Sequence, residues 1–350
     1  MVGSVRRFQC MAGLVAGVAV TVLQMPVAAQ AAEQPSTVNG CTWVINELPL
    51  PTGWKAGYVN NGDRRDSFTG YGVDADGRTR PLVWHAGEVT VLEAPGGVDA
   101  TAQDVNSHGD VVGVTQAEDA PAHGILWRGG QVIDLPVLPG GDIAVPTAIN
   151  DAGLIVGSAS DAQAGHAVVW STHSPQTIRD LGVLTGSAYL TDVTEKGVVV
   201  GWTDSAGEDF REQAIAGTVR RGLTTLPGPL PGTNSIARAA AGSSIVGGAA
   251  LTDASQDPPG AAIWAPTGPR ALPGTNATAY AVNDHGTVVG TDAALGPVIW
   301  VGDDEQPLPA LTAGDPFSTS ATAVANNNTA AGTSADAQGH SRPVTWSCIS

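Results

Sequence analysis

The feature that most constrains this chain is a short, largely aliphatic run that ends in tryptophan and recurs roughly every 40 residues. Six copies end in Trp84, Trp127, Trp170, Trp264, Trp300 and Trp346. A seventh, degenerate copy fills the double gap after Trp170, with Gly217 where the tryptophan is expected. Seven units of this length are typical of the blades of a β-propeller.

Each repeat predicts four short antiparallel strands. In the clearest copy, which begins at Ala279, two alternating runs are separated by Asn283, Asp284 and Gly286. Asn and Asp bond to their own backbone in turns and glycine accepts positive φ, so this segment predicts a hairpin. A third strand ends in the tryptophan, and a fourth carries an L-x-x-L pattern, as in Ile133–Gly141. Helical periodicity is missing, so the predicted fold class is all-β.

The two ends of the chain predict how these sheets are arranged. Four-stranded sheets this small must stack on neighbours, in a line or in a ring. The last repeat supplies only three strands, whereas Trp43–Gly53 matches the fourth-strand pattern and has no repeat before it. We therefore predict a seven-bladed β-propeller of four-stranded antiparallel blades, closed by the N-terminal strand pairing with the C-terminal blade. This pairing would bring Cys41 beside Cys348, and we expect a disulfide between them.

The first 31 residues are predicted to be a secretory signal peptide that is removed. Arg6 and Arg7 precede an apolar run from Met11 to Leu23, and an A-x-A cleavage site ends at Ala31. We expect residues 32–40 to form a short flexible N-terminus and residues 41–350 a single propeller domain. The remaining chain has no apolar run long enough to cross a membrane. These observations predict a secreted, extracellular monomer without membrane contact after processing.

The six repeated tryptophans are predicted to be structural. An indole side chain buries a large apolar area, and six of them at one blade position would form a packing layer between blades. Trp54 and Trp202 lie outside this register and are therefore freer to serve a function.

The charge of the chain points to a candidate ligand-binding face. The formal net charge is −17, which disfavours nucleic acid as a partner. Acidic residues recur between the second and third strands of the blades, so they should emerge together on one face. The predicted ligand face consists of Glu118, Asp119, Asp161, Asp204, Glu208, Asp209, Asp253, Asp257, Asp292 and Asp336.

The repeats resemble the extracellular HAF-repeat family of bacteria, in which a His-Ala-Phe step opens a strand that ends in Trp. The closest copy is Gly165–Trp170 followed by Ile178–Gly186, and the resemblance extends over residues 57–348. Arg80, Gln213 and Arg342 replace the histidine in other copies. The resemblance implies secretion and a propeller-like fold, but no particular reaction.

Three kinds of sequence pattern bear on possible chemistry: histidines, enzyme signatures and calcium loops. His123 and His166 open equivalent strands, where a bond to a turn carboxylate is the expected role. Nucleophile, zinc-protease and phosphate-loop signatures are missing. Calcium at Val73–Gly77 or Asn60–Asp66 is a weaker alternative to having no cofactor, because neither segment has the full series of oxygen ligands.

The leading functional hypothesis is a non-enzymatic binding or scaffolding propeller that contacts an extracellular protein, peptide or cell-wall glycan. The alternative is a carbohydrate-active hydrolase or lyase with its site in the central funnel. An enzyme would need acidic groups that converge there. Asp104, Asp192 and Arg238, on or near the innermost strands, are the residues whose meeting would favour catalysis.

Overall fold

The computed structural model describes residues 41–117, 120–204, 211–228, 234–250, 260–312 and 318–349. The predicted signal peptide and the expected flexible segment 32–40 lie outside this part of the chain. Its described regular structure is β-strand apart from one short 3₁₀ helix, η1 (Pro95–Gly97). None of the described helical structure is long and apolar enough to cross a membrane.

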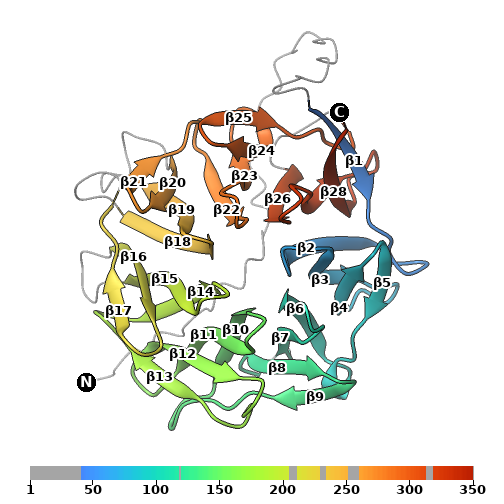
Figure 1. Ribbon diagram of the computed structural model, residues 1–350. Helices are drawn as coiled ribbons and strands as arrows, with labels where there is room; N and C mark the ends of the chain where they lie inside the picture. The colour runs from blue at the N-terminus through green and yellow to red at the C-terminus, as the bar shows by residue number, and fades with distance from the viewer. Residues whose placement is uncertain are drawn as a thin grey trace, which may run out of the picture. The chain divides into compact units, whose positions relative to one another are not determined.

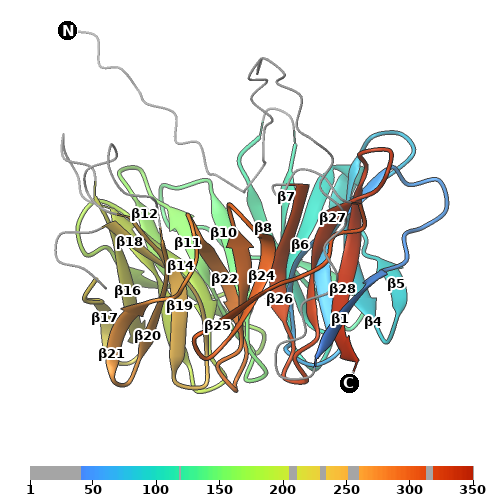
Figure 2. The same ribbon diagram turned by 90° about the horizontal axis from the view of Figure 1, so that it is seen from above.

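The strands form seven four-stranded antiparallel sheets arranged as blades around a central axis (Figure 1, Figure 2). In chain order they are β1 (Thr42–Glu47), β2 (Ala56–Gly62), β3 (Ser67–Val73), β4 (Thr79–His85), β5 (Glu88–Val91), β6 (Asp99–Val105), β7 (Val111–Gln116), β8 (His123–Arg128), β9 (Gln131–Asp134), β10 (Ala144–Ile149), β11 (Leu154–Ser160), β12 (Gly165–Ser171), β13 (Arg179–Gly182), β14 (Ala188–Val193), β15 (Val198–Asp204), β16 (Glu212–Thr218), β17 (Gly222–Thr225), β18 (Asn234–Ala241), β19 (Ser244–Ala250), β20 (Gly260–Ala265), β21 (Gly268–Ala271), β22 (Thr278–Val282), β23 (Val288–Asp292), β24 (Gly296–Val301), β25 (Asp304–Pro307), β26 (Thr319–Val324), β27 (Ala330–Ala335) and β28 (Ser341–Ile349).

Blades one to six each take four consecutive strands, from β2–β5 to β22–β25, and blade seven has the order β1-β28-β27-β26. Within a blade we call the strands A to D from the axis outwards. All blades run in the same sense, so the A–B turns lie on one face of the ring and the B–C loops on the other. The all-β, seven-bladed prediction is confirmed.

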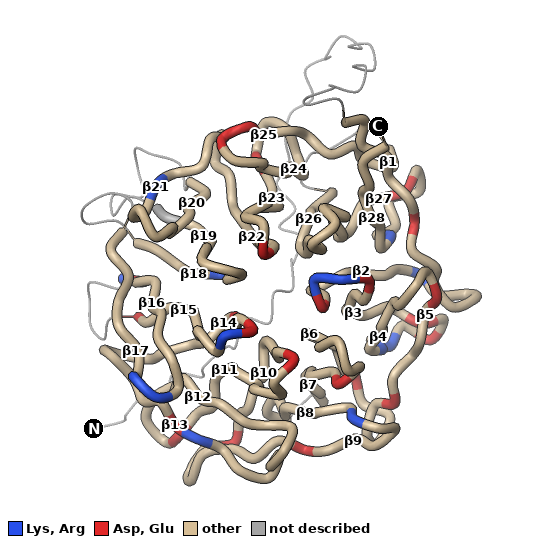
Figure 3. The backbone as a smooth tube through the Cα atoms, in the orientation of Figure 1, with Lys and Arg blue, Asp and Glu red and all other residues tan. Residues whose placement is uncertain are grey.

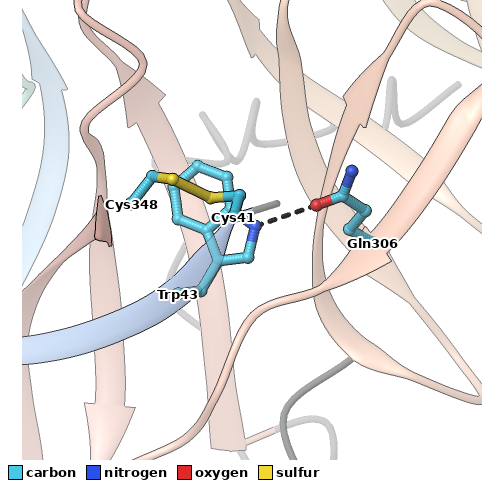
Figure 4. Close-up of a disulfide and its surroundings, with 4 residues drawn as sticks. All are labelled: Cys41, Trp43, Gln306 and Cys348. Carbon is cyan, nitrogen blue, oxygen red and sulfur yellow. Dashed lines mark hydrogen bonds between the residues drawn. A yellow bond between two sulfur atoms is a disulfide. The ribbon is translucent and has the colours of Figure 1, made fainter. Parts of the chain in front are cut away.

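The ring is closed by the N-terminal strand, as predicted. β1 pairs antiparallel with β28, which places Trp43 opposite Cys348. Cys41 and Cys348 form a disulfide with their Cα atoms 5.5 Å apart. The indole N–H of Trp43 also donates to Oε1 of Gln306 in blade six at 3.0 Å (Figure 4). A stable disulfide is typical of an oxidising compartment.

The six repeated tryptophans lie in the hydrophobic layers between blades. Trp84, Trp170, Trp300 and Trp346 are at most 1% exposed, and the other two at most 6%. Each indole N–H donates to a backbone carbonyl on the segment that precedes its own blade. The accepting residues are Pro49, Glu93, Pro136, Pro227, Pro273 and Pro309. Each ring is thereby fixed in place as well as buried, because a buried indole N–H needs an acceptor.

Candidate functional site

The B–C loops carry the predicted ligand face, and four of its ten residues are described. Asp161, Asp204, Asp292 and Asp336 lie at the start of B–C loops in blades three, four, six and seven. The remaining members, Glu118, Asp119, Glu208, Asp209, Asp253 and Asp257, lie outside the described residues. The ligand-binding role of all ten stays a prediction.

Each of the four described carboxylates is engaged by the protein itself. Oδ1 of Asp161 accepts the backbone N–H groups of Gln163 and Ala164, and the bond from Ala164 is the main reason that its pKa is lowered. Asp292 is 2% exposed and binds the N–H groups of its loop in the same way. Oδ1 of Asp204 accepts the N–H of Ser187. These aspartates therefore shape the bases of their loops.

The residue that opens strand C supplies a partner for these carboxylates. In blade three, Nε2 of His166 lies 3.1 Å from Oδ2 of Asp161, and Nδ1 lies 3.0 Å from Asp180 on β13. In blade seven, Nε of Arg342 lies 2.8 Å from Oδ2 of Asp336. Partial burial raises the pKa of Asp336, but the bonds from its loop and from Arg342 outweigh this and hold it at about 2.

The same pairing occurs in blade one, where Nε of Arg80 lies 3.1 Å from Oδ2 of Asp74. Oδ1 of Asp74 accepts the N–H groups of Asp76 and Arg78. His166 in blade three and Arg80 in blade one therefore have the same role, because each pairs with the aspartate of its own B–C loop. Both oxygens of Asp74 are engaged, and the described residues contain no group of three or more His, Cys, Asp or Glu side chains placed to hold a metal ion. Calcium in Val73–Gly77 stays a prediction.

The opposite face is held together by charged A–B turns. Oδ1 of Asp151 accepts the N–H of Ser107 in the preceding blade at 2.8 Å, and the N–H of Asp151 donates to Glu195 in the next blade. Asp284 accepts the N–H of Gly242 in the same manner. Figure 3 shows acidic and basic segments at the inner ends of several blades, around the axis. The hydrogen bonds of Asp151 and Asp284 join neighbouring blades.

Two of the three residues proposed as markers of catalysis lie in one buried cluster. Asp104 and Asp192 are each 4% exposed. Arg64, from the A–B turn of blade one, reaches Asp192 on β14 at 3.0 Å and the carbonyl oxygen of Ala240 on β18 at 2.8 Å. Figure 1 shows blades four and five across the ring from blade one. The contacts of Arg64 with Asp192 and Ala240 therefore require its side chain to cross the axis.

The electrostatics of this cluster are those of buried acids. Burial, and then the charge of Asp192, raise the pKa of Asp104 well above its usual value. Its Oδ2 accepts the N–H of Ile149, while its Oδ1 has no hydrogen-bond partner among the described residues. Burial also raises the pKa of Asp192, although Arg64 opposes the shift. Arg238 makes its described contact elsewhere, over the ring of Tyr280.

The innermost strands share a β-bulge that faces the next blade. At four of the seven bulges the side chain donates to a backbone carbonyl of that blade. For example, Thr191 donates to the carbonyl of Ala237 at 2.9 Å and Thr322 to that of Val59 at 2.8 Å. The bulge positions are Asn60, Gln103, Thr147, Thr191, Arg238, Tyr280 and Thr322. At the bulges of blades five and six this contact is replaced by the guanidinium of Arg238, 5.5 Å from the ring centre of Tyr280.

Sequence reasoning missed two stacked aromatic pairs on the two inner strands of blades one and four. Tyr58 and Tyr71 stack at 4.7 Å, and Tyr189 and Trp202 stack at 4.3 Å. The register of strand pairing would have been needed to predict these aromatic pairs from the sequence.

An open groove of about 520 Å³ lies beside the ring closure, where it is lined by Glu47–Trp54, Gly87 and Arg342.

Comparison with solved structures supports the fold alone. The β-propeller domain of the Trilobed protease from Pyrococcus furiosus is similar with a TM-score of 0.59 at 8% identity, covering 84% of this chain and 97% of that one. A puromycin-hydrolysing peptidase of Mycobacterium tuberculosis gives a TM-score of 0.51 at 14% identity, covering 85% and 54%. A prolyl endopeptidase gives 0.50 at 12% identity, covering 85% and 51%.

This chain therefore spans only about half the length of these two peptidases. The Pyrococcus domain is described as having an open velcro topology, whereas here β1 closes blade seven. No family model matches the chain, and no curated protein matches it in sequence. The class that the fold defines is the seven-bladed β-propeller.

Proposed function

We propose that this chain is a secreted, non-catalytic binding propeller that contacts an extracellular protein, peptide or glycan through its B–C loop face. One observation carries the proposal: the two faces of the ring are built differently. The A–B turns are bonded from blade to blade. The described B–C loops at Asp161, Asp292 and Asp336 are instead bonded to N–H groups of their own loop. Binding residues concentrate on loops that a rigid scaffold positions.

The cluster around Arg64 supports a binding role over a catalytic one. Asp104 and Asp192 are buried, and Asp192 is already paired. Carboxylates that act on a glycoside need access to the bond between them. The proposal also includes membership in the HAF-repeat family, because the strand-opening His166 and its arginine replacements share one structural role.

Binding screens on residues 32–350 test this function. We would measure capture of extracellular proteins and glycans by the wild type and by the triple variant Asp161→Asn, Asp204→Asn, Asp292→Asn. Asparagine keeps one side-chain oxygen for the loop N–H groups and removes the charge. The matched control, Asp151→Asn with Asp284→Asn, neutralises two carboxylates on the opposite face. Weaker binding by the triple variant alone is expected. Equal binding by all three proteins would refute the role of the acidic loops.

A hydrolase or lyase is the second candidate, and one observation favours it. The pKa of Glu305 on β25 is raised to about 7 by burial and then by the charge of Asp292. A carboxyl group with such a pKa can act as a general acid near neutral pH. Turnover of a polysaccharide panel that is lost in Glu305→Gln would favour the enzyme. Polysaccharide turnover at the wild-type rate in Glu305→Gln would show that Glu305 is not the general acid.

A further inference from the structure

We propose that the groove beside the ring closure binds a neutral glycan. A sugar ring lies on Trp54, and Glu47 and Arg342 bind its hydroxyl groups. The groove has a volume of about 520 Å³ and is lined by all three residues. Pockets that hold small ligands typically measure roughly 300–1,000 Å³. None of the lining residues belongs to the predicted ligand face, so this site is separate from the one in the proposed function.

Trp54 is placed unlike the other tryptophans. It lies in the connection from β1 to β2, on the outer side of the ring (Figure 1), whereas the other eight tryptophans lie on strands. Its indole N–H donates to no described residue. Three buried polar side-chain atoms in the described part of the chain lack a partner, and this nitrogen is not one of them, so it reaches solvent. The partly buried Trp54 therefore has a donor available to a ligand.

The indole of Trp54 is held in place before any ligand arrives. A Cβ on Gly72 of β3 would lie 2.5 Å from Cε3 of Trp54, so the ring packs directly against the backbone of this glycine. The ring also joins the hydrophobic cluster around Leu82 and Trp84. A side chain that is already fixed loses less entropy on binding. Its exposed part offers an apolar surface for the C–H groups of a sugar ring.

The walls of the groove are rigid, and much of their backbone is engaged. Pro49 and Pro51 have a fixed φ and no N–H group. The carbonyl of Pro49 accepts the indole N–H of Trp84 at 2.8 Å, and that of Pro51 accepts the backbone N–H of Trp54 at 3.2 Å. A peptide that binds as an added strand needs free backbone groups. The groove therefore favours a ligand that is recognised by side chains.

Two charged side chains in the groove have free atoms that match sugar hydroxyls. Glu47 is exposed, and its carboxylate is bonded to no described residue. Nε of Arg342 lies 2.8 Å from Oδ2 of Asp336, which orients the guanidinium, while its two terminal nitrogens are bonded to no described residue. The groove thus offers both an acceptor and donors to hydroxyl groups. The net charge of −17 repels acidic polysaccharides, which favours a neutral glycan.

Calorimetric titration tests the inference and separates a glycan from a peptide. We would titrate residues 32–350 with cellohexaose, chitohexaose, xylohexaose and a mixture of hexapeptides. Acrylamide quenching of fluorescence is measured in parallel in Trp202→Phe. Trp54 and Trp202 are the two tryptophans that are only partly buried, so quenching in this variant reports on Trp54. At least one hexasaccharide should bind and protect the fluorescence.

Three variants alter the groove, and three matched controls alter the same residue types elsewhere. The groove variants are Trp54→Ala, Glu47→Gln and Arg342→Gln. The controls are Trp202→Phe, Glu93→Gln and Arg80→Gln. Each groove variant should weaken hexasaccharide binding about tenfold or more, and each control should stay within about twofold of wild type. Near-ultraviolet circular dichroism checks folding, and Glu47→Gln changes only an exposed side chain.

Three results would overturn the inference: no hexasaccharide binds, only the hexapeptides bind, or the groove variants bind as well as wild type. The triple variant of the B–C loop aspartates should keep its hexasaccharide binding. Binding that is lost in the triple variant but kept in the groove variants would reject the groove and support the loop face. A protein captured through the B–C loops, without any glycan binding, would reject the groove alone.

Discussion

Replacing Arg64 by methionine tests whether the side chain that crosses the ring axis stabilises the fold. Arg64 is bound to Asp192 at 3.0 Å and to the carbonyl of Ala240 at 2.8 Å, and the exposed side-chain fractions of the ion pair are 18% and 6%. Removing one member of a buried ion pair typically costs about 3–5 kcal/mol. Asp192 keeps its bond from the N–H of Ala240, so we expect roughly 3 kcal/mol, at the lower end of that range.

The loss should depend on pH, and its sign follows from the pKa of Asp192. Burial raises this pKa and Arg64 opposes the rise. Without Arg64 the folded-state pKa rises further above the unfolded value, so the folded state holds its proton more tightly. The variant should therefore be closest to wild type in acid and lose stability as the pH rises through the range between the two pKa values.

Thermal and urea unfolding between pH 4 and pH 8 measure this effect. A loss of roughly 3 kcal/mol corresponds to a melting temperature lower by about 4–5 °C for a domain of this size. Adding Asp192→Asn to Arg64→Met removes the uncompensated charge and should recover part of the stability at pH 8. A melting temperature for Arg64→Met within 2 °C of wild type, or no recovery in the double variant, would refute this account of the axial cluster.

Three further predictions follow from buried groups. Glu305 has a folded-state pKa of about 7 against an ordinary value of 4.5, so the native state loses stability as the pH rises from about 4.5 to 7; partial exposure limits this to roughly 1–2 kcal/mol, and Glu305→Gln should flatten the stability profile measured by urea unfolding. Cys41→Ser with Cys348→Ser opens a loop with a sequence separation of 307 and should lower the free energy of unfolding by up to about 5–6 kcal/mol; no change in urea would mean that strand pairing alone closes the ring. Trp300→Phe removes the bond to Pro273 from a fully buried ring and should cost about 2–3 kcal/mol by thermal unfolding, whereas Trp202→Phe should cost under about 1 kcal/mol.

The blades and their closure could be predicted because their signals are local and repeated. The turn residues Asn283, Asp284 and Gly286 mark one A–B turn, and Asn150 with Gly153 marks another. The tryptophan at the end of each third strand sets the register of the blade. A fourth-strand pattern without a repeat before it indicated which segment completes blade seven.

The structural role of the loop aspartates leaves a trace in the sequence that residue type alone does not explain. Asp74 precedes Arg80 by six residues, and Asp336 precedes Arg342 by the same spacing. A carboxylate at the loop start and a cation at the start of the next strand form an ion pair within one hairpin. The ligand face was predicted from acidic residues at a shared blade position, and its binding role stays a prediction; the hydrogen bonds of these residues to backbone N–H groups could not be seen in the composition.

The axial cluster could not be predicted from the sequence. Arg64 and Asp192 are 128 residues apart, and their contact depends on which blades face each other across the ring. The β-bulge that places Arg238 over Tyr280 likewise depends on strand register. Trp202 was distinguished by its position outside the tryptophan repeat, but its stacking on Tyr189 required the pairing of β14 with β15.

Peptide mapping by mass spectrometry without reductant is the most direct measurement of the closed ring. The disulfide can form only if the first and last described strands lie side by side in blade seven. We expect a single linked peptide pair that contains Cys41 and Cys348 in the folded protein. Two free thiols on these cysteines, each open to alkylation before unfolding, would contradict the closure on which the arrangement of both faces depends.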